Sequence, residues 1–234
     1  MLNPNNWPNI IQQWLYPPTC LLCEQPGIAG FDLCPSCHDS LPFNREACIC
    51  CGLPISTGQI RQRCGPCSKN QPPFDSTLAL FTYNEPVRYL IRSLKYNGNY
   101  ASGRLLGNLM AQALANQPMH PQLIVPVPLH PTRFQQRGFN QAIEIARPIS
   151  KNLGIPIAPK LCVRSRETPA QSGLSARQRA INIKHAFEIG QAVEVDHVAI
   201  LDDVVTTGAT VTELSRVLRN AGIKKIEIWA CARA

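Results

Sequence analysis

Residues 198–210, VAILDDVVTTGAT, combine an apolar run, two adjacent carboxylates and a short loop rich in threonine. Where a strand turns into a helix, backbone N–H groups and the helix dipole favour a bound anion such as phosphate. Gly208 leaves room for such an anion. The carboxylates of Asp202 and Asp203 repel phosphate but suit the vicinal hydroxyls of a sugar. No G-K-[ST] follows the turn, which argues against a P-loop. The pattern therefore predicts a sugar-phosphate site.

The positive charge of the chain is concentrated in one segment. The formal net charge is +8, and the window from Arg133 to Lys184 holds ten basic residues against two acidic ones, Glu144 and Glu167. The remainder of the chain is balanced. Such a window can be a solvated basic surface, but beside a sugar-phosphate motif it favours a site for phosphate, pyrophosphate or nucleic acid.

Eight of the eleven cysteines form four C-x-x-C pairs, with 10, 10 and 12 residues between successive pairs. Two such pairs supply the four thiolates of a tetrahedral Zn²⁺ site. Disulfides would need an oxidising compartment, and a thioredoxin-like redox site would need a pair on a βαβ unit. We therefore expect two structural Zn²⁺ ions, with neighbouring pairs joined in sequence order in preference to a crossed arrangement. The expected ligands are Cys20, Cys23, Cys34, Cys37, Cys48, Cys51, Cys64 and Cys67.

Strands and helices alternate after the cysteine pairs. Apolar runs predict strands, and a 3.6-residue periodicity predicts helices. This alternation predicts a mostly parallel sheet with right-handed crossovers, whose ligands bind at the carboxyl ends of the strands. The expected strands are 76–83, 122–128, about 160–163, 197–201 and 224–232, and the expected helices are 86–98, 103–117, 139–154 and 209–222.

The chain divides into three predicted segments. Residues 1–19 carry tryptophan, isoleucine and leucine at the spacing of a short amphipathic helix, 20–70 hold the cysteine pairs, and 76–234 hold the α/β pattern. No apolar run approaches the roughly 18 residues of a membrane helix, and the start lacks the basic and apolar regions of a secretory signal. We therefore expect a cytoplasmic protein without a membrane span.

The stretch 198–210 resembles the phosphoribosyl-pyrophosphate (PRPP) signature of type I phosphoribosyltransferases. Together with VPVPLHPTRFQQRGFNQ (125–141) and the four cysteine pairs, it is similar to the ComF/GntX family over nearly the whole chain. The resemblance implies an α/β fold: a type I phosphoribosyltransferase-like, mostly parallel sheet with helices on both faces, preceded by a small cysteine-rich double zinc ribbon.

The resemblance also implies PRPP, accompanied by Mg²⁺, as the ligand. Asp202 and Asp203 would bind the ribose 2′- and 3′-hydroxyls. The 5′-phosphate would be bound by Thr206, Thr207, Gly208, Ala209 and Thr210, and the pyrophosphate by the loop that carries Arg133, Arg137 and Gly138. Arginine forks suit the oxygens of a pyrophosphate.

The family name implies a role in DNA uptake for natural transformation, with single-stranded DNA and proteins of the competence machinery as partners. The alternative is an active phosphoribosyltransferase that moves phosphoribose from PRPP to a small base or amine, unrelated to DNA. No histidine triad is present, so no catalytic residue is assigned. Phe134 and Phe139 are the aromatics among the arginines, which favours phosphate contacts over base stacking. The residues expected to close over the ligand or to contact nucleic acid are Lys95, Arg164, Arg166, Arg177 and Arg179.

Overall fold

The computed structural model describes residues 18–28, 31–55, 62–166, 183–192 and 194–234. The chain divides into two compact units, residues 1–41 and residues 42–234. The second unit contains the sheet and also the second group of cysteine pairs. The amphipathic helix predicted at 1–19 falls almost wholly outside the described residues.

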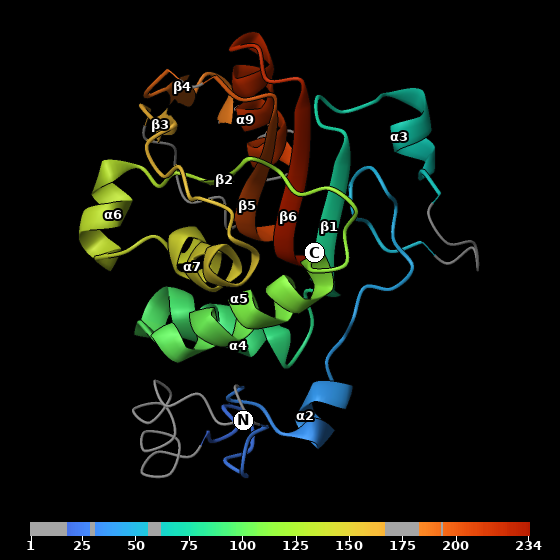
Figure 1. Cartoon of the computed structure of the whole chain (residues 1–234), viewed down its shortest axis with the longest axis vertical. Helices are drawn as coiled ribbons and strands as arrows, with labels where there is room; N and C mark the ends of the chain where they lie inside the picture. The colour runs from blue at the N-terminus through green and yellow to red at the C-terminus, as the bar shows by residue number, and fades with distance from the viewer. Residues whose placement is uncertain (1–17, 29–30, 56–61, 167–182, 193) are drawn as a thin grey trace, which may run out of the picture. The chain divides into compact units, whose positions relative to one another are not determined.

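A four-stranded parallel sheet forms the centre of the second unit, in the order β1-β6-β5-β2 (Figure 1). The strands are β1 (Ser76–Thr82), β2 (Leu123–Pro126), β5 (His197–Val205) and β6 (Lys225–Arg233). In register, Leu123 of β2 lies beside Val198 of β5. The parallel sheet predicted from the strand–helix alternation is confirmed.

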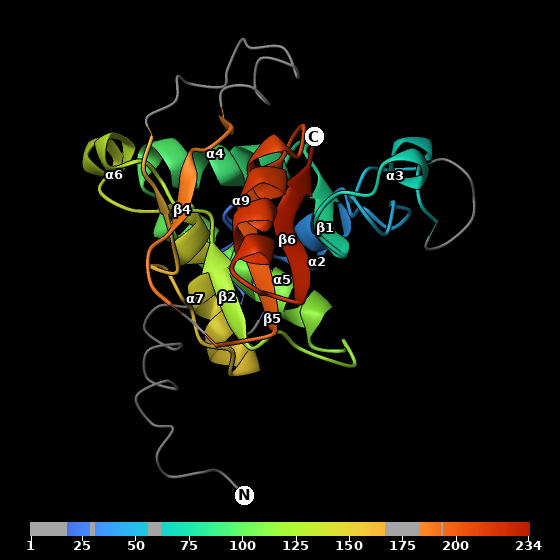
Figure 2. The same ribbon diagram turned by 90° about the horizontal axis from the view of Figure 1, so that it is seen from above.

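Helices cover both faces of this sheet (Figure 2). Alternate residues of a strand point to opposite faces: Ile228 of β6 packs in the apolar cluster that includes Leu214 and Leu218 of α9 (Ala209–Asn220), whereas the Cys231 thiol lies 3.6 Å from Met110 Sδ of α5. The helices on the α5 side are α4 (Val87–Asn97), α5 (Tyr100–Leu114) and α7 (Gln141–Leu153). Helices on both faces were predicted, and this is confirmed.

Three details differ from the sequence-based prediction. The strand expected near 160–163 is β3 (Cys162–Arg164), which pairs antiparallel with β4 (Phe187–Ile189) in a separate two-stranded sheet. A short helix, α6 (Pro131–Arg137), follows β2 and ends at Gly138, whose φ is 80°. Strand β5 continues four residues beyond the expected end, to Val205, because Asp202–Val205 remain beside β6.

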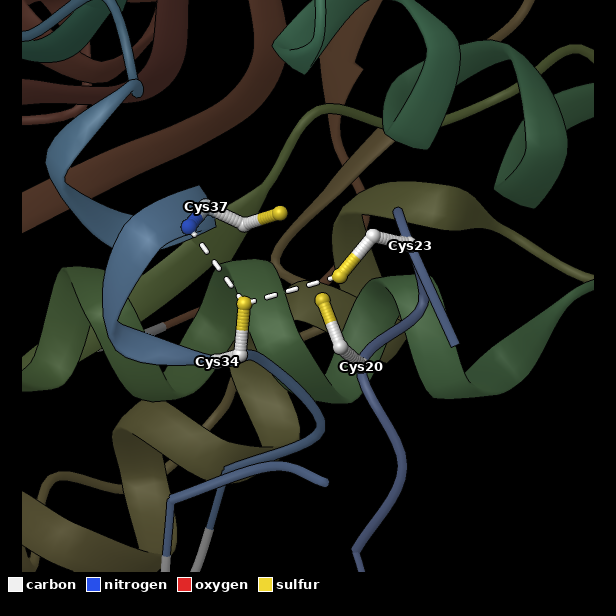
Figure 3. A group of neighbouring side chains, drawn as sticks. All are labelled: Cys20, Cys23, Cys34 and Cys37. Atoms are coloured by element: carbon white, nitrogen blue, oxygen red, sulfur yellow. Dashed lines mark hydrogen bonds between the residues drawn. The ribbon is translucent and has the colours of Figure 1, made fainter. Parts of the chain in front are cut away.

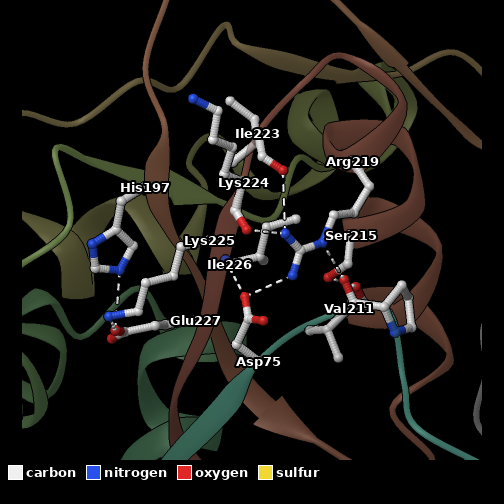
Figure 4. A network of polar contacts seen from close by, with 11 residues as sticks. Asp75, His197, Val211, Ser215, Arg219, Ile223, Lys224, Lys225, Ile226 and Glu227 are labelled. Atoms are coloured by element: carbon white, nitrogen blue, oxygen red, sulfur yellow. Dashed lines mark hydrogen bonds and ion pairs between the residues drawn. The ribbon is translucent and has the colours of Figure 1, made fainter.

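A polar network stabilises the amino ends of β5 and β6 (Figure 4). Asp75 Oδ2 accepts hydrogen bonds from Arg219 Nη2 (2.6 Å) and Ile226 N (2.7 Å). His197 Nε2 lies 3.0 Å from Glu227 Oε1, and burial lowers the pKa of His197. These polar groups satisfy one another, so this end of the sheet is structural. Among the described helices, none combines the length and hydrophobicity that crossing a membrane requires.

Candidate functional site

A cavity of about 620 Å³ opens at the carboxyl ends of β2 and β5. This is the edge at which ligands of parallel α/β sheets bind. Its polar lining combines two acids, four basic side chains and a glycine–threonine loop. The lining residues that could contact a ligand through polar groups are Tyr83, Lys95, Tyr96, Arg133, Arg137, Gln141, Arg164, Asp202, Asp203, Thr206, Gly208, Ala209 and Thr210.

The two acids belong to strand β5 and differ in their contacts. The buried Asp203 receives hydrogen bonds from Lys95 Nζ at 2.9 Å and from Gln141 Nε2 at 3.2 Å. Asp202, whose side chain starts from the opposite face of the strand, accepts a hydrogen bond from the backbone N–H of Asp203 at 2.9 Å. The side chains of α4 and α7 therefore hold Asp203 in place, whereas Asp202 keeps more capacity for a ligand.

The electrostatics of the pair follow from these contacts. Burial and the neighbouring Asp203 carboxylate raise the pKa of Asp202 to about 8. Burial acts to raise the pKa of Asp203 as well, but the Lys95 ammonium and the hydrogen bonds outweigh it, and the pKa is lowered. The same partnership raises the pKa of Lys95 against the effect of burial. The opposite shifts make Asp203 the more acidic member of the pair and favour the protonated form of Asp202 in the ligand-free protein.

The loop of residues 206–210 connects β5 to α9. Gly208 has φ 78°, a conformation that suits glycine, and no heavy atom lies within 4 Å of where its Cβ would stand. Thr206, Gly208, Ala209 and Thr210 line the cavity. Thr207 does not; its hydroxyl accepts the N–H of Ala209 at 3.3 Å. The loop therefore places the N-terminal turn of α9 at the cavity.

Arginine side chains also line the cavity. Arg133 and Arg137 stand one turn apart on α6, and Arg164 ends β3. Arg137 Nη1 donates to Gln141 Oε1, and its guanidinium lies 6.0 Å from the Tyr96 ring centroid. Burial lowers the pKa of both Arg137 and Arg164. These are partly desolvated cations, whose attraction for an anion exceeds that of a fully hydrated arginine.

The eight paired cysteines form two compact clusters. In each, the four Sγ atoms lie within 4.8 Å of one another, and the groups are Cys20, Cys23, Cys34, Cys37 and Cys48, Cys51, Cys64, Cys67. In the first, the side chains converge on a common point (Figure 3). The grouping is the sequential one that we expected. The second cluster lies in the same compact unit as the sheet.

The geometry of both clusters fits Zn²⁺. Cys23 Sγ lies 3.5 Å from Cys34 Sγ, and Cys51 Sγ lies 3.6 Å from Cys64 Sγ. A disulfide would require about 2.05 Å, whereas Zn–S bonds of about 2.3 Å in a tetrahedron separate the sulfurs by about 3.8 Å. Burial acts to raise the thiol pKa of Cys20 and Cys48, but backbone N–H groups outweigh it and lower the values to about 6 and about 7. Each cluster thus holds a ready thiolate ligand.

The two clusters repeat the same backbone pattern. The residue after the first pair of each has a positive φ, 63° at Glu24 and 70° at Gly52. The second pair of each opens a five-residue helix, α2 (Pro35–Asp39) or α3 (Gly65–Lys69). Antiparallel bridges join Thr19 to Pro26 and Ala47 to Pro54. In all four pairs, the residue four places after the first cysteine donates its N–H to that cysteine's carbonyl: Glu24 to Cys20, His38 to Cys34 and Gly52 to Cys48 at 2.9 Å, and Ser68 to Cys64 at 3.0 Å.

Comparison with known proteins identifies this duplicated module and relatives of the whole chain. Residues 11–68 match the family model of the double zinc ribbon domain. Competence protein F of Haemophilus influenzae is 34% identical, over 92% of this chain and 96% of that protein. The chain belongs to the ComF family. DNA utilization protein YhgH of Salmonella typhi is also 34% identical, over 93% of this chain and 97% of that protein. Competence protein ComFC of Streptococcus pneumoniae is 26% identical, over 66% of this chain and 67% of that protein.

Solved structures similar to this ComF-family chain include phosphoribosyltransferases. Adenine phosphoribosyltransferase from Thermoanaerobacter pseudethanolicus has 18% identity and a TM-score of 0.38, covering 59% of this chain and 83% of that chain. Hypoxanthine phosphoribosyltransferase from Trypanosoma cruzi has 13% identity and a TM-score of 0.36, covering 58% of this chain and 74% of that chain. At these identities the likeness concerns the fold alone.

The cavity of this ComF-family protein unites most of the residues expected there from the sequence. Lys95 and Arg164, expected as lid or nucleic-acid contacts, line the cavity itself. Gly138 ends α6 without lining the cavity, and Arg166 donates to the carbonyl of Lys184 at 2.8 Å. Arg177 and Arg179 lie outside the described residues.

Sequence reasoning missed Gln141 and Tyr96 as site residues. Gln141 ends the 125–141 stretch that supports the family resemblance, and Tyr96 follows Lys95 directly. Both signals were therefore present in the sequence. Neither could be interpreted without knowing that α4 and α7 lie together beside the carboxyl end of β5.

Proposed function

We propose that the cavity binds PRPP with Mg²⁺. The proposal is supported above all by the complementarity of one cavity: a helix N-terminal loop for a phosphate, an acidic pair for hydroxyls, and an arginine wall for a pyrophosphate. These three parts come from three separate segments of the chain, residues 202–210, helix α6 and strand β3, and PRPP carries all three groups in a single molecule.

Each part has a defined task in this proposal. The N–H groups of the 206–210 loop bind the 5′-phosphate, and Asp202 accepts hydrogen bonds from the ribose. Lys95 and Gln141 hold the Asp203 carboxylate in position. Arg133, Arg137 and Arg164 neutralise the pyrophosphate. The carboxylate oxygens belong to the hard ligand class that Mg²⁺ accepts, and the ion when bound would neutralise charge between pyrophosphate and ribose.

Calorimetric titration of PRPP in the presence of Mg²⁺ tests this site. We expect Asp202→Asn/Asp203→Asn to weaken the affinity by about 100-fold or more, because two hydrogen bonds to charged groups are lost. The matched control is Asp196→Asn, which removes a carboxylate from the opposite end of the sheet, where it pairs with Lys224 at 3.1 Å. Equal PRPP affinity in the wild type and the double variant would refute the assignment.

Proton release provides a second measure of the acidic pair. Burial and the Asp203 carboxylate raise the pKa of Asp202, which favours its protonated form in the free protein at neutral pH. Hydroxyl donors and Mg²⁺ favour its carboxylate, so binding should expel up to one proton, and affinity should rise up to about tenfold from pH 7 to pH 9. Titrations in buffers of different ionisation enthalpy measure this proton. It should vanish in Asp202→Asn, and its persistence there would assign the proton to another group.

We further propose that the rim of the same cavity contacts single-stranded DNA. Tyr96 and Phe134 are 70% and 48% exposed, and Arg137 lies against the Tyr96 ring. Phe139, by contrast, is buried and packs on Tyr100, with ring centroids 5.1 Å apart. Exposed aromatic faces beside arginines bind single strands by stacking and by phosphate attraction. Stacking therefore contributes more than the sequence suggested.

Binding of a fluorescent oligothymidine at several salt concentrations tests this second proposal. We expect Arg133→Glu to reduce both the affinity and its salt dependence, and Tyr96→Ala to reduce the affinity without changing the salt dependence. Lys224→Glu, an equal charge reversal at the far end of the sheet, is the control. A salt-independent affinity would exclude the basic rim as the DNA site. PRPP-dependent release of pyrophosphate, assayed with and without the oligonucleotide, separates a PRPP-binding protein from an active transferase.

A further inference from the structure

The sheet holds the second zinc ribbon through consecutive carbonyl groups. Each of the four peptide carbonyls from residue 49 to residue 52 accepts a hydrogen bond from outside the ribbon. The donors come from the edge strand β1, from the end of β6 and from Asn44, which precedes the ribbon in the chain. The carbonyl oxygens of Ile49, Cys50, Cys51 and Gly52 accept, in that order, from Thr77 N (3.0 Å), Thr77 Oγ1 (2.6 Å), Arg233 Nε (3.0 Å) and Asn44 Nδ2 (2.9 Å).

Arg233 differs from the other donors because it also reaches the 206–210 loop. It ends β6, between β1 and β5 (Figure 1), and only 5% of the residue is exposed. Its Nη1 donates to the carbonyl of Val205 at 2.9 Å and to that of Thr206. A single guanidinium thus joins Cys51, a member of the second cluster, to the first residue of the 206–210 loop.

These contacts orient the loop. A trans peptide is planar, so its carbonyl and the following N–H point in opposite directions. Arg233 shares the Val205 carbonyl with Ala234 N (3.0 Å) and also holds the Thr206 carbonyl. These bonds fix the peptide planes on both sides of Thr206, the first loop residue that lines the cavity. A loop whose donors are already oriented binds an anion at a smaller entropic cost, because less of the loop must be ordered on binding.

The cluster also supplies Arg233 with negative charge. Burial lowers the pKa of Arg233, and the thiolates of Cys51, Cys64 and Cys67 act in the opposite direction. Four thiolates around one Zn²⁺ carry a net charge of about −2, and the metal keeps them deprotonated. When the ion is lost, the ribbon loses both its charge and the shape that presents the Cys51 carbonyl.

We infer that Arg233 is a positioning residue through which the second Zn²⁺ strengthens PRPP binding at the 206–210 loop, and bound PRPP retards loss of that ion. The inference rests on the proposed PRPP site. The two effects must accompany each other, because binding free energies are reciprocally linked. For the first Zn²⁺, whose cysteines belong to the other compact unit, residues 1–41, we expect no such effect of PRPP.

Release of Zn²⁺ to the colorimetric chelator 4-(2-pyridylazo)resorcinol, followed on the full-length protein with and without PRPP and Mg²⁺, tests the coupling. Two ions are released from the wild type, and Cys20→Ser/Cys34→Ser and Cys48→Ser/Cys64→Ser assign each phase to its cluster. We expect PRPP to slow release of the second ion and leave that of the first unchanged. This measurement needs no substitution at Arg233.

Arg233→Met should abolish the protection and weaken PRPP affinity by about tenfold, the effect of one lost hydrogen bond from a charged group. Arg233→Lys keeps the charge but lacks the fork that reaches both partners, so it should restore little. The matched control is Arg219→Met (Figure 4): Arg219 also bonds to backbone carbonyls, those of Pro73 (3.1 Å) and Ile223 (3.3 Å), at the end of the sheet away from the cavity.

The outcomes separate the two proposals. If the wild type fails to bind PRPP, the proposed function is wrong and the coupling falls with it. If the wild type binds PRPP but Arg233→Met or Arg233→Lys binds equally well, the site stands and the coupling is wrong. The coupling would also be wrong if PRPP slowed the release of both ions equally. It would be wrong as well if Arg219→Met reduced PRPP affinity as much as Arg233→Met does.

Discussion

The two zinc ribbons of this protein have the same local structure but different surroundings. Both use a C-x-x-C turn with a left-handed residue after it and a second pair that opens a five-residue helix. The second ribbon is also bonded to the sheet through the carbonyls of residues 49–52. The first lies in a separate compact unit. Ligand spacing is therefore sufficient to build a metal site, whereas tertiary contacts determine what the metal can influence.

Removing each cluster in turn should give the largest difference. Cys48→Ser/Cys64→Ser releases the four hydrogen bonds to the carbonyls of residues 49–52, three from the sheet and one from Asn44. At about 1 kcal/mol each, their loss corresponds to a Tm lower by about 8–16 °C for a unit of this size. Cys20→Ser/Cys34→Ser should leave the Tm of the α/β unit within about 2 °C. Thermal unfolding followed by far-UV circular dichroism measures both. Similar decreases would mean that the ribbons are equally integrated with the sheet.

Substitutions at Gly52 and Glu24, the two positions with a left-handed backbone in the ribbons, should change the free energy of unfolding in opposite directions. Gly52 has φ 70°, and a Cβ there would stand 2.8 Å from Thr77 Cγ2. Gly52→Ala should therefore destabilise the α/β unit by about 2–3 kcal/mol. At the equivalent position in the first ribbon, Glu24→Gly relieves backbone strain, so it should stabilise the ribbon, by less than about 1 kcal/mol.

Denaturant unfolding gives both free energies. Gly65→Ala is the control, since nothing lies within 4 Å of its Cβ position. A tolerated alanine at position 52 would contradict close packing of the second ribbon on β1.

The order of zinc loss should also distinguish the ribbons. Cys23 of the first cluster is exposed, whereas the members of the second are buried or half-buried. A chelator should therefore extract the first ion at least about fivefold faster, the equivalent of about 1 kcal/mol in opening free energy. The two single-cluster serine variants provide the separate rates. Faster release from the second cluster would reverse the assignment of the more protected site.

The smallest effect is expected from one hydroxyl. Thr77→Val removes the 2.6 Å hydrogen bond to the Cys50 carbonyl but keeps the backbone N–H that bonds to Ile49. We expect a loss of about 1 kcal/mol in the unfolding free energy. Thr82→Val on the same strand should cost less, because its hydroxyl lies 3.5 Å from the Pro42 carbonyl and accepts only an exposed hydrogen bond from Asn84 Nδ2 at 3.2 Å. The opposite ranking would show that the Thr77 hydroxyl does not anchor the ribbon.

The sequence predicted features that depend on local spacing. The C-x-x-C pairs indicated two zinc sites because chelation by a turn needs only neighbouring residues. The run into Asp202 and the loop around Gly208 indicated an anion site at a strand end because a strand-to-helix turn is itself a local structure. Alternating strands and helices indicated a parallel sheet through general rules of topology.

The tertiary structure determined which distant side chains meet. Lys95 is 108 residues from Asp203, Gln141 is 62 residues from it, and Arg233 is 182 residues from Cys51. No periodicity encodes such contacts, since they arise when parallel strands bring their carboxyl ends to one edge. Pairing of β5 with β6 as far as Val205 also made the acids part of a strand. The sequence by itself thus determined the chemical groups and their local turns. Only the packing of the sheet decided that Lys95 holds Asp203 and that the second zinc ribbon and the 206–210 loop share Arg233.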